Sequence, residues 1–133
     1  MRKQGLGRKK ILMSRVAAIR GAITAEANTK DEILMRTEEL LSEIAAENRL
    51  APEDIISIIF TATRDLDAAF PAEAARNLGW LETPLLDAVE ISVPGSLPRT
   101  IRVLVHINTR EDRFKPQHVY LRDAAQLRPD LEW

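Results

Sequence analysis

Runs of apolar and β-branched residues predict the strands of one sheet. The runs cover residues 16–24, 55–63, 85–93 and 100–108, and a short fifth strand is expected at 118–121. The run 55–63 is almost continuously apolar, which favours a central strand that is covered on both faces. The run 100–108 instead alternates, so that every second residue from Ile101 to Ile107 lies on one face.

Helical patterns separate these strands. Thr29 and Glu32 form a capping box, and the helix that follows is expected to end near residue 48. Its apolar stripe consists of Ile33, Thr37, Leu40, Leu41 and Ile44. A proline-led turn at 51–54, a helix at 71–78 ahead of Gly79 and a short helix at 122–127 complete the pattern. The alternation of strands and helices predicts an α/β or α+β architecture with a mixed β-sheet.

Length and composition narrow the class of protein. The chain has 133 residues, a typical length for one domain. The formal net charge of -1 gives no reason to expect nucleic acid or an anionic membrane as partner. The absence of cysteine excludes disulfides and cysteine-based zinc sites and fits a cytoplasmic protein. No apolar run reaches the length of about 20 residues that a membrane-spanning helix needs.

The start of the chain differs from the rest. Basic residues and two glycines crowd residues 1–14, and no apolar segment of signal-peptide length follows them. We expect residues 1–14 to form a disordered basic extension and residues 15–133 to form the domain. Two alternatives are a nucleic-acid-binding tail and a natural start at Met13.

Charged residues interrupt three of the predicted strands, at Arg20, Glu90 and Arg102. No phosphate-loop, nucleophile-elbow or zinc-protease motif is present. His106 and His118 are too few for a metal site, so no metal is expected. Any chemistry should therefore depend on fixed charges that position a substrate and stabilise its transition state. The alternative is that the three charges belong to the solvated polar face of a half-buried sheet.

Other polar positions admit two interpretations. Glu73 and Arg76, three apart on a helix, could form a surface ion pair or contact a ligand. Phe70 could pack as a hydrophobic staple or form the wall of a pocket. Asp87 and Glu90 point to opposite faces of a regular strand, because residues three apart do so, and they converge only if the strand is bulged or bent.

Four stretches together resemble the AroH class of chorismate mutase, the small trimeric type typified in Bacillus. The stretches are Ile19-Arg20-Gly21-Ala22, residues 65–72, residues 94–103, and His118-Val119-Tyr120-Leu121 with residues 127–131. The resemblance rests on the order, spacing and joint presence of these stretches, and it covers about residues 16–131. The resemblance implies an α+β fold in which three protomers form a pseudo α/β-barrel, with active sites between neighbouring subunits.

The same resemblance implies an activity and a pathway. The protein would be an isomerase that converts chorismate to prephenate by a Claisen rearrangement, on the route to phenylalanine and tyrosine. That reaction needs no cofactor and no covalent intermediate, which agrees with the absence of a nucleophile.

The resemblance also assigns roles to individual residues. Arg102 would stabilise the ether oxygen as its bond to carbon breaks, Arg20 and Tyr120 would bind the dianionic substrate, and Glu90 would accept a hydrogen bond from the ring hydroxyl. Residues that would line the cleft are Phe70, Ala72, Glu73, Arg76, Leu85, Leu86 and Asp87, and Arg128 would close over it. Glu73 stands where the Bacillus pattern has a lysine, and Asp87 where it has a cysteine that touches the ring hydroxyl.

Two rival hypotheses belong to other classes. One is a small trimeric imine or enamine hydrolase, which builds a similar pseudo-barrel with an arginine between subunits. The other is a non-catalytic module that uses its arginines to hold a carboxylate metabolite. Consumption of chorismate, or binding without turnover, separates these from a mutase.

Overall fold

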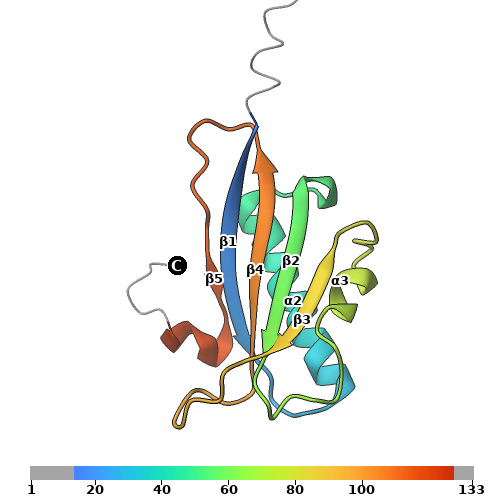
Figure 1. The fold of residues 1–133 in the computed structure, drawn as a ribbon, viewed down its shortest axis with the longest axis vertical. Coiled ribbons are helices and arrows are strands. Elements are labelled where there is room, and N and C mark those ends of the chain that lie inside the picture. The colour runs from blue at the N-terminus through green and yellow to red at the C-terminus, as the bar shows by residue number, and fades with distance from the viewer. Residues whose placement is uncertain (1–13, 128–133) are drawn as a thin grey trace, which may run out of the picture.

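One five-stranded sheet forms the centre of the computed structural model, which describes residues 14–127 (Figure 1). The strands are β1 (Arg15–Thr24), β2 (Ile55–Ala62), β3 (Leu85–Val89), β4 (Thr100–Thr109) and β5 (Val119–Tyr120), in the order β3-β2-β4-β1-β5. β4 is antiparallel to both β1 and β2, whereas β3 and β5 run parallel to β2 and β1. This mixed sheet with its helices confirms the α+β architecture.

The helical segments occupy the predicted places. They are α2 (Lys30–Asn48), α3 (Glu73–Asn77) and two 3₁₀ turns, η1 (Pro52–Asp54) and η2 (Arg122–Leu127). α2 and α3 pack on each other and contribute to one core on the same face of the sheet. In Figure 1, α2 lies behind the strands as drawn. We call this side the helix face and the opposite side the open face.

The start of α2 differs from the predicted capping box in one bond. The Thr29 hydroxyl accepts the backbone N–H of Glu32 at 3.2 Å, as predicted. The Glu32 carboxylate, however, accepts the N–H of Glu26 at 2.8 Å, so it ties down the preceding loop rather than the cap residue. Arg36 donates to the same carboxylate at 2.9 Å. The helix ends at Arg49, whose left-handed backbone (φ 54) closes it.

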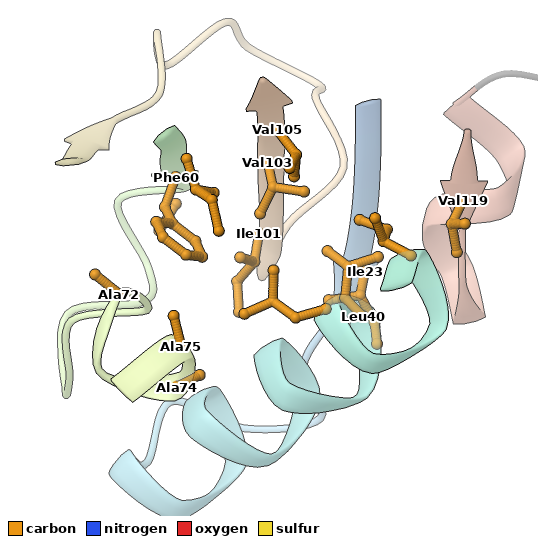
Figure 2. Packing of buried hydrophobic residues seen from close by; sticks show 14 of the residues in the cluster. Ile23, Leu40, Phe60, Ala72, Ala74, Ala75, Ile101, Val103, Val105 and Val119 are labelled. Carbon is orange, nitrogen blue, oxygen red and sulfur yellow. The ribbon is translucent and has the colours of Figure 1, made fainter. Parts of the chain in front are cut away.

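The main hydrophobic core lies between the helix face and α2. The alternating residues Ile101, Val103, Val105 and Ile107 of β4 are all buried there, as the sequence pattern predicts. Figure 2 shows Ile101, Val103 and Val105 of β4 in this layer, and Leu40 of α2 beside Ile23 of β1. Complete burial of a side chain of this size contributes about 1.5–3 kcal/mol, so this face supplies much of the driving force for folding.

α2 approaches β1 closely at Gly21. A Cβ atom built at Gly21 would lie 2.7 Å from Cδ1 of Ile44, 3.2 Å from Cδ1 of Leu40 and 3.1 Å from the carbonyl oxygen of Val119. The absence of a side chain at this position therefore lets the helix and β5 seat against the strand.

The open face carries little of the chain's own structure. Within residues 14–127, η2 covers part of it, where Ala22, Tyr120 and Ala124 form a small buried cluster. On β2, Ile56 is 37% exposed and Ile59 is half-buried. The prediction that both faces of the 55–63 strand are covered is therefore wrong for the part of the chain that the structure describes, because α2 and α3 lie on the same face.

Two elements have other limits than the sequence predicts. The third strand was expected to reach residue 93 but ends at Val89. The N–H of Glu90 still donates to the carbonyl of Ala62 at 3.0 Å, but β2 ends there. In the described part of the chain Ile91 and Val93 therefore have no strand to pair with, and they are exposed. The second helix begins later than predicted, at Glu73. The predicted extension over 1–14 lies, apart from Ser14, outside the described residues.

Candidate active site

A hydrogen-bonded group of three side chains lies on the open face. Arg102 on β4 and Thr61 on β2 are opposed in the antiparallel register, and Glu90 follows directly after β3. Nε of Arg102 and the hydroxyl of Thr61 both donate to Oε2 of Glu90, each at 2.8 Å. The Glu90 side chain is only 13% exposed, whereas Arg102 is 40% exposed. The guanidinium is thus anchored through Nε, and its two terminal nitrogens lie toward the surface.

Arg20 and Tyr120 lie on the same face as this group. Tyr120 pairs with Ala22, and Ala22 in turn pairs with Arg102, so the three residues form one row across the sheet. Arg20 is two residues before Ala22 on β1 and therefore points to the same face, where it is exposed. The backbone N–H of Arg20 donates to Nδ1 of His118 at 3.0 Å, which links β1 to the segment before β5. The two arginines and the tyrosine face one region of the open side.

A cleft of about 580 Å³ opens elsewhere, at the ends of β2 and β3 and the starts of α2 and α3. Phe70, Glu73, Asp87 and Lys30 are among its lining residues. Phe70 is 70% exposed, which is unusual for an aromatic side chain and leaves its ring available as a cleft wall. Nζ of Lys30 lies 3.6 Å from Oε2 of Glu73, so a cation and an anion lie side by side in the cleft wall.

The cleft contains an acid with a shifted pKa, Asp87. Burial raises the pKa of its carboxyl above the usual value, while a hydrogen bond from the Ala72 N–H and the positive charge of Arg76 act in the opposite direction. The Ala72 N–H lies 3.0 Å from Oδ1 of Asp87. Asp87 pairs with the buried Phe60 in the β2–β3 register, which places it on the helix face.

Within residues 14–127, no cluster of three histidine or acidic side chains could hold a metal ion. No helix in the described part of the chain is long and apolar enough to cross a membrane.

Comparison with known proteins assigns the chain to a family. The family model for chorismate mutase type I matches residues 16–131. The chain belongs to this family. It is 52% identical to chorismate mutase AroH of Thermus thermophilus over 118 residues, which is 88% of this chain and 97% of that protein. It is 43% identical to chorismate mutase AroH of Bacillus subtilis (strain 168) over 117 residues, 87% of this chain and 92% of that protein.

A solved structure supports the same relationship. The chorismate mutase from Clostridium thermocellum Cth-682 superimposes with a TM-score of 0.80 at 56% sequence identity, covering 83% of this chain and 98% of that one. The recognition of an AroH-class chorismate mutase from the four sequence stretches is confirmed.

The structure sorts the family-derived site residues into two groups. The open-face group consists of Arg20, Leu86, Glu90, Arg102 and Tyr120. The cleft group consists of Phe70, Glu73 and Asp87, which line the cleft, together with three residues near them on the helix side that do not line it, Ala72, Arg76 and Leu85. Arg128 lies outside the described residues. A single chorismate mutase chain therefore does not bring all the expected residues to one cavity, because Asp87 and Glu90 point to opposite faces of the sheet, as their spacing predicts for a regular strand.

Two residues at these sites were missed by the sequence reasoning. Thr61 sits inside an apolar run, but strand alternation from the buried Phe60 and Ala62 could have placed it on the open face. Lys30 begins α2, and nothing in the local sequence indicates that the start of α2 meets the start of α3.

Proposed function

We propose that the protein is a chorismate mutase that converts chorismate to prephenate, the reaction of its family, in aromatic amino acid biosynthesis. The observation that best supports this is the Arg102–Glu90 pair on the open face, held at 2.8 Å in a chain so closely related to named chorismate mutases. Such a group supplies fixed positive charge without any nucleophile.

The chemistry requires charge stabilisation rather than group transfer. In the Claisen rearrangement the ether C–O bond of chorismate breaks while a new C–C bond forms within the same molecule, so no proton, electron or atom is exchanged with the protein. The ether oxygen becomes more negative in the transition state. A guanidinium that is positioned in advance binds this state more tightly than the ground state, and only such differential binding accelerates the step.

Arg102 is suited to this role by its anchoring. Among residues 14–127 its two terminal nitrogens have no hydrogen-bond partner, because Glu90 engages only Nε. They can therefore donate to the ether oxygen and to a substrate carboxylate together, which the planar guanidinium allows and an ammonium does not. Arg20 and Tyr120 would hold the remaining negative charge of the dianion, and Glu90 would accept the ring hydroxyl through its second oxygen.

The division of the site between two faces supports an assembly. We infer that the cleft group of one protomer completes the open-face group of its neighbour, in a homotrimer whose sheets form a pseudo-barrel. The exposed Ile56, Leu86 and Val89, at 37%, 61% and 64%, provide apolar surface for such contacts. In that assembly Phe70, Arg76 and Asp87 reach the substrate from the neighbouring subunit, and Arg128 would cover it.

The enzyme would need no cofactor or metal, since every step above uses only side chains of the protein. We place it in the cytoplasm, as expected from a biosynthetic activity shared with bacterial relatives.

Incubation of the purified protein with chorismate tests the proposal. We expect the ultraviolet absorbance of chorismate to fall and prephenate to be the product. Arg102→Ala should reduce turnover by at least about a hundredfold, as loss of one such donor usually does. Chorismate that is bound but not converted would favour a binding module. No consumption of chorismate, together with hydrolysis of an imine or enamine, would favour the hydrolase.

A further inference from the structure

Thr61 shares an acceptor atom with Arg102. Its hydroxyl and Nε of Arg102 both donate to Oε2 of Glu90 at 2.8 Å, and Thr61 lies directly opposite Arg102 on the neighbouring strand. The three side chains come from three separate stretches of chain, and no role in the reaction has been assigned to the threonine.

We propose that Thr61 is a positioning residue that fixes the Glu90 carboxylate, and through it the Arg102 guanidinium, for the mutase reaction. The inference rests on the proposed function, since it concerns the same site. Thr61 itself does not touch the substrate in this account. It determines the orientation of the two groups that do.

The backbone around Glu90 shows why such an anchor is needed. Glu90 lies one residue beyond the end of β3, and among residues 14–127 no strand lies beside the residues that follow it. Its N–H donates to Ala62 at 3.0 Å, which fixes the backbone but leaves the side-chain torsions to be set by other contacts. Thr61 is one residue before Ala62 on β2, so the same strand holds both the backbone and the side chain of Glu90.

Threonine is well suited to this position. It is half-buried on a regular strand, and its branched Cβ restricts the side-chain torsion more than serine would. A hydrogen bond to a carboxylate is stronger than one between neutral groups. With both donors on Oε2, the other oxygen of Glu90 is the one left for the substrate hydroxyl, and the guanidinium is held by its inner nitrogen only.

Removal of the hydroxyl frees the carboxylate to turn. Arg102 is then held to a group that is no longer fixed, and its outer nitrogens lose their alignment with the ether oxygen. Because that contact strengthens in the transition state, the loss should appear in kcat rather than in KM. A misplacement of about 1 Å can cost about a hundredfold, and we expect a smaller displacement and a fall in kcat of about tenfold.

Three variants of the full chain test this. Thr61→Val keeps the shape of the side chain and removes the donor, whereas Thr61→Ser keeps the donor. Ser57→Ala is the matched control, because Ser57 lies four residues earlier on the same strand and face and also contacts a β4 side chain, with its hydroxyl 3.3 Å from Nδ1 of His106. Each is assayed for kcat and KM with chorismate and for its melting temperature, alongside the unsubstituted protein and Arg102→Ala.

The expected pattern is specific. Thr61→Val should lose about tenfold in kcat with KM within about twofold, Thr61→Ser should recover most of the loss, and Ser57→Ala should resemble the unsubstituted protein. The proposal is overturned if Thr61→Val keeps its kcat, or if Thr61→Ser is as slow as Thr61→Val. It is also overturned if kcat in the three variants simply follows the melting temperature, because that is the result of a purely structural role. In all these cases an active unsubstituted protein and an impaired Arg102→Ala leave the proposed function standing, whereas an inactive unsubstituted protein removes both.

Discussion

Substitution of Gly21 by alanine tests whether the close seat of α2 and β5 on β1 is needed for stability. The added Cβ would lie 2.7 Å from Cδ1 of Ile44. Carbon atoms normally rest about 3.5–4.0 Å apart, so the Ile44 methyl must retreat by roughly 1 Å. The Val119 carbonyl oxygen, at 3.1 Å, belongs to backbone and yields less readily.

Overpacking of this kind costs about 1–3 kcal/mol in a well-packed core. For a chain of this length the melting temperature should fall by roughly 3–10 °C. Circular dichroism at fixed protein concentration measures it, because the melting temperature of the proposed trimer would depend on concentration. Since Val119 precedes Tyr120, a displaced β5 should also raise KM for chorismate.

A second substitution checks the stated cause. Ile44→Val removes Cδ1 and alone should cost about 0.5–1.5 kcal/mol. The double variant should lose less stability than the sum of the losses in the two single variants, because the clash with Cδ1 of Ile44 has been removed. The reasoning would be refuted by an unchanged melting temperature for Gly21→Ala, or by stability losses of Gly21→Ala and Ile44→Val that add strictly in the double variant. Either result would show that α2 and β5 leave room for a side chain at Gly21.

Three further predictions concern the site. Arg102→Lys should remain slow, within about tenfold of Arg102→Ala in kcat, because an ammonium cannot hold Glu90 and donate two parallel bonds; near-normal turnover would contradict this. Asp87→Asn should raise the melting temperature at neutral pH and not in acid. The raised pKa of Asp87 means that the folded state releases this proton at a higher pH than the unfolded state does. The folded state therefore loses stability as the pH rises from about 4 through that pKa. A difference in stability between the variant and the unsubstituted protein that is constant from acid to neutral pH would argue against this cause. Glu73→Gln should lower KM by a few-fold with kcat unchanged, since it leaves Lys30 unpaired at the cleft, and the gain should shrink at high salt; an effect that salt leaves untouched would exclude this cause.

Local sequence patterns were sufficient for most elements. The Thr29 cap and the apolar stripe gave the limits of α2, and the alternation from Ile101 to Ile107 gave the buried face of β4. Each of these signals depends only on neighbours in the sequence. The 85–93 strand was predicted too long, because its end depends on where β2 stops, and no pattern within the segment carries that information.

The apolar run 55–63 shows a different limit. Its composition correctly indicates a strand with little polar surface, yet within residues 14–127 Ile56 stays 37% exposed and Ile59 is only half-buried. An apolar sequence indicates that its side chains need to be buried, but not which element buries them. The candidate site shows the same limit, because the family resemblance named residues on both faces of the sheet, and the local sequence indicated only that Asp87 and Glu90 would diverge.

The most direct test of the shared site is complementation between two defective chains. Arg102→Ala damages the open-face group and Arg76→Ala the cleft group, so each variant alone should be nearly inactive. When the two are co-expressed in equal amounts, a site between subunits has intact halves from both neighbours in roughly a quarter of cases, given random mixing in a cyclic trimer. The account predicts recovery of about that fraction of the activity of the unsubstituted protein. Co-purified mixed assemblies that stay as inactive as the separate variants would contradict it.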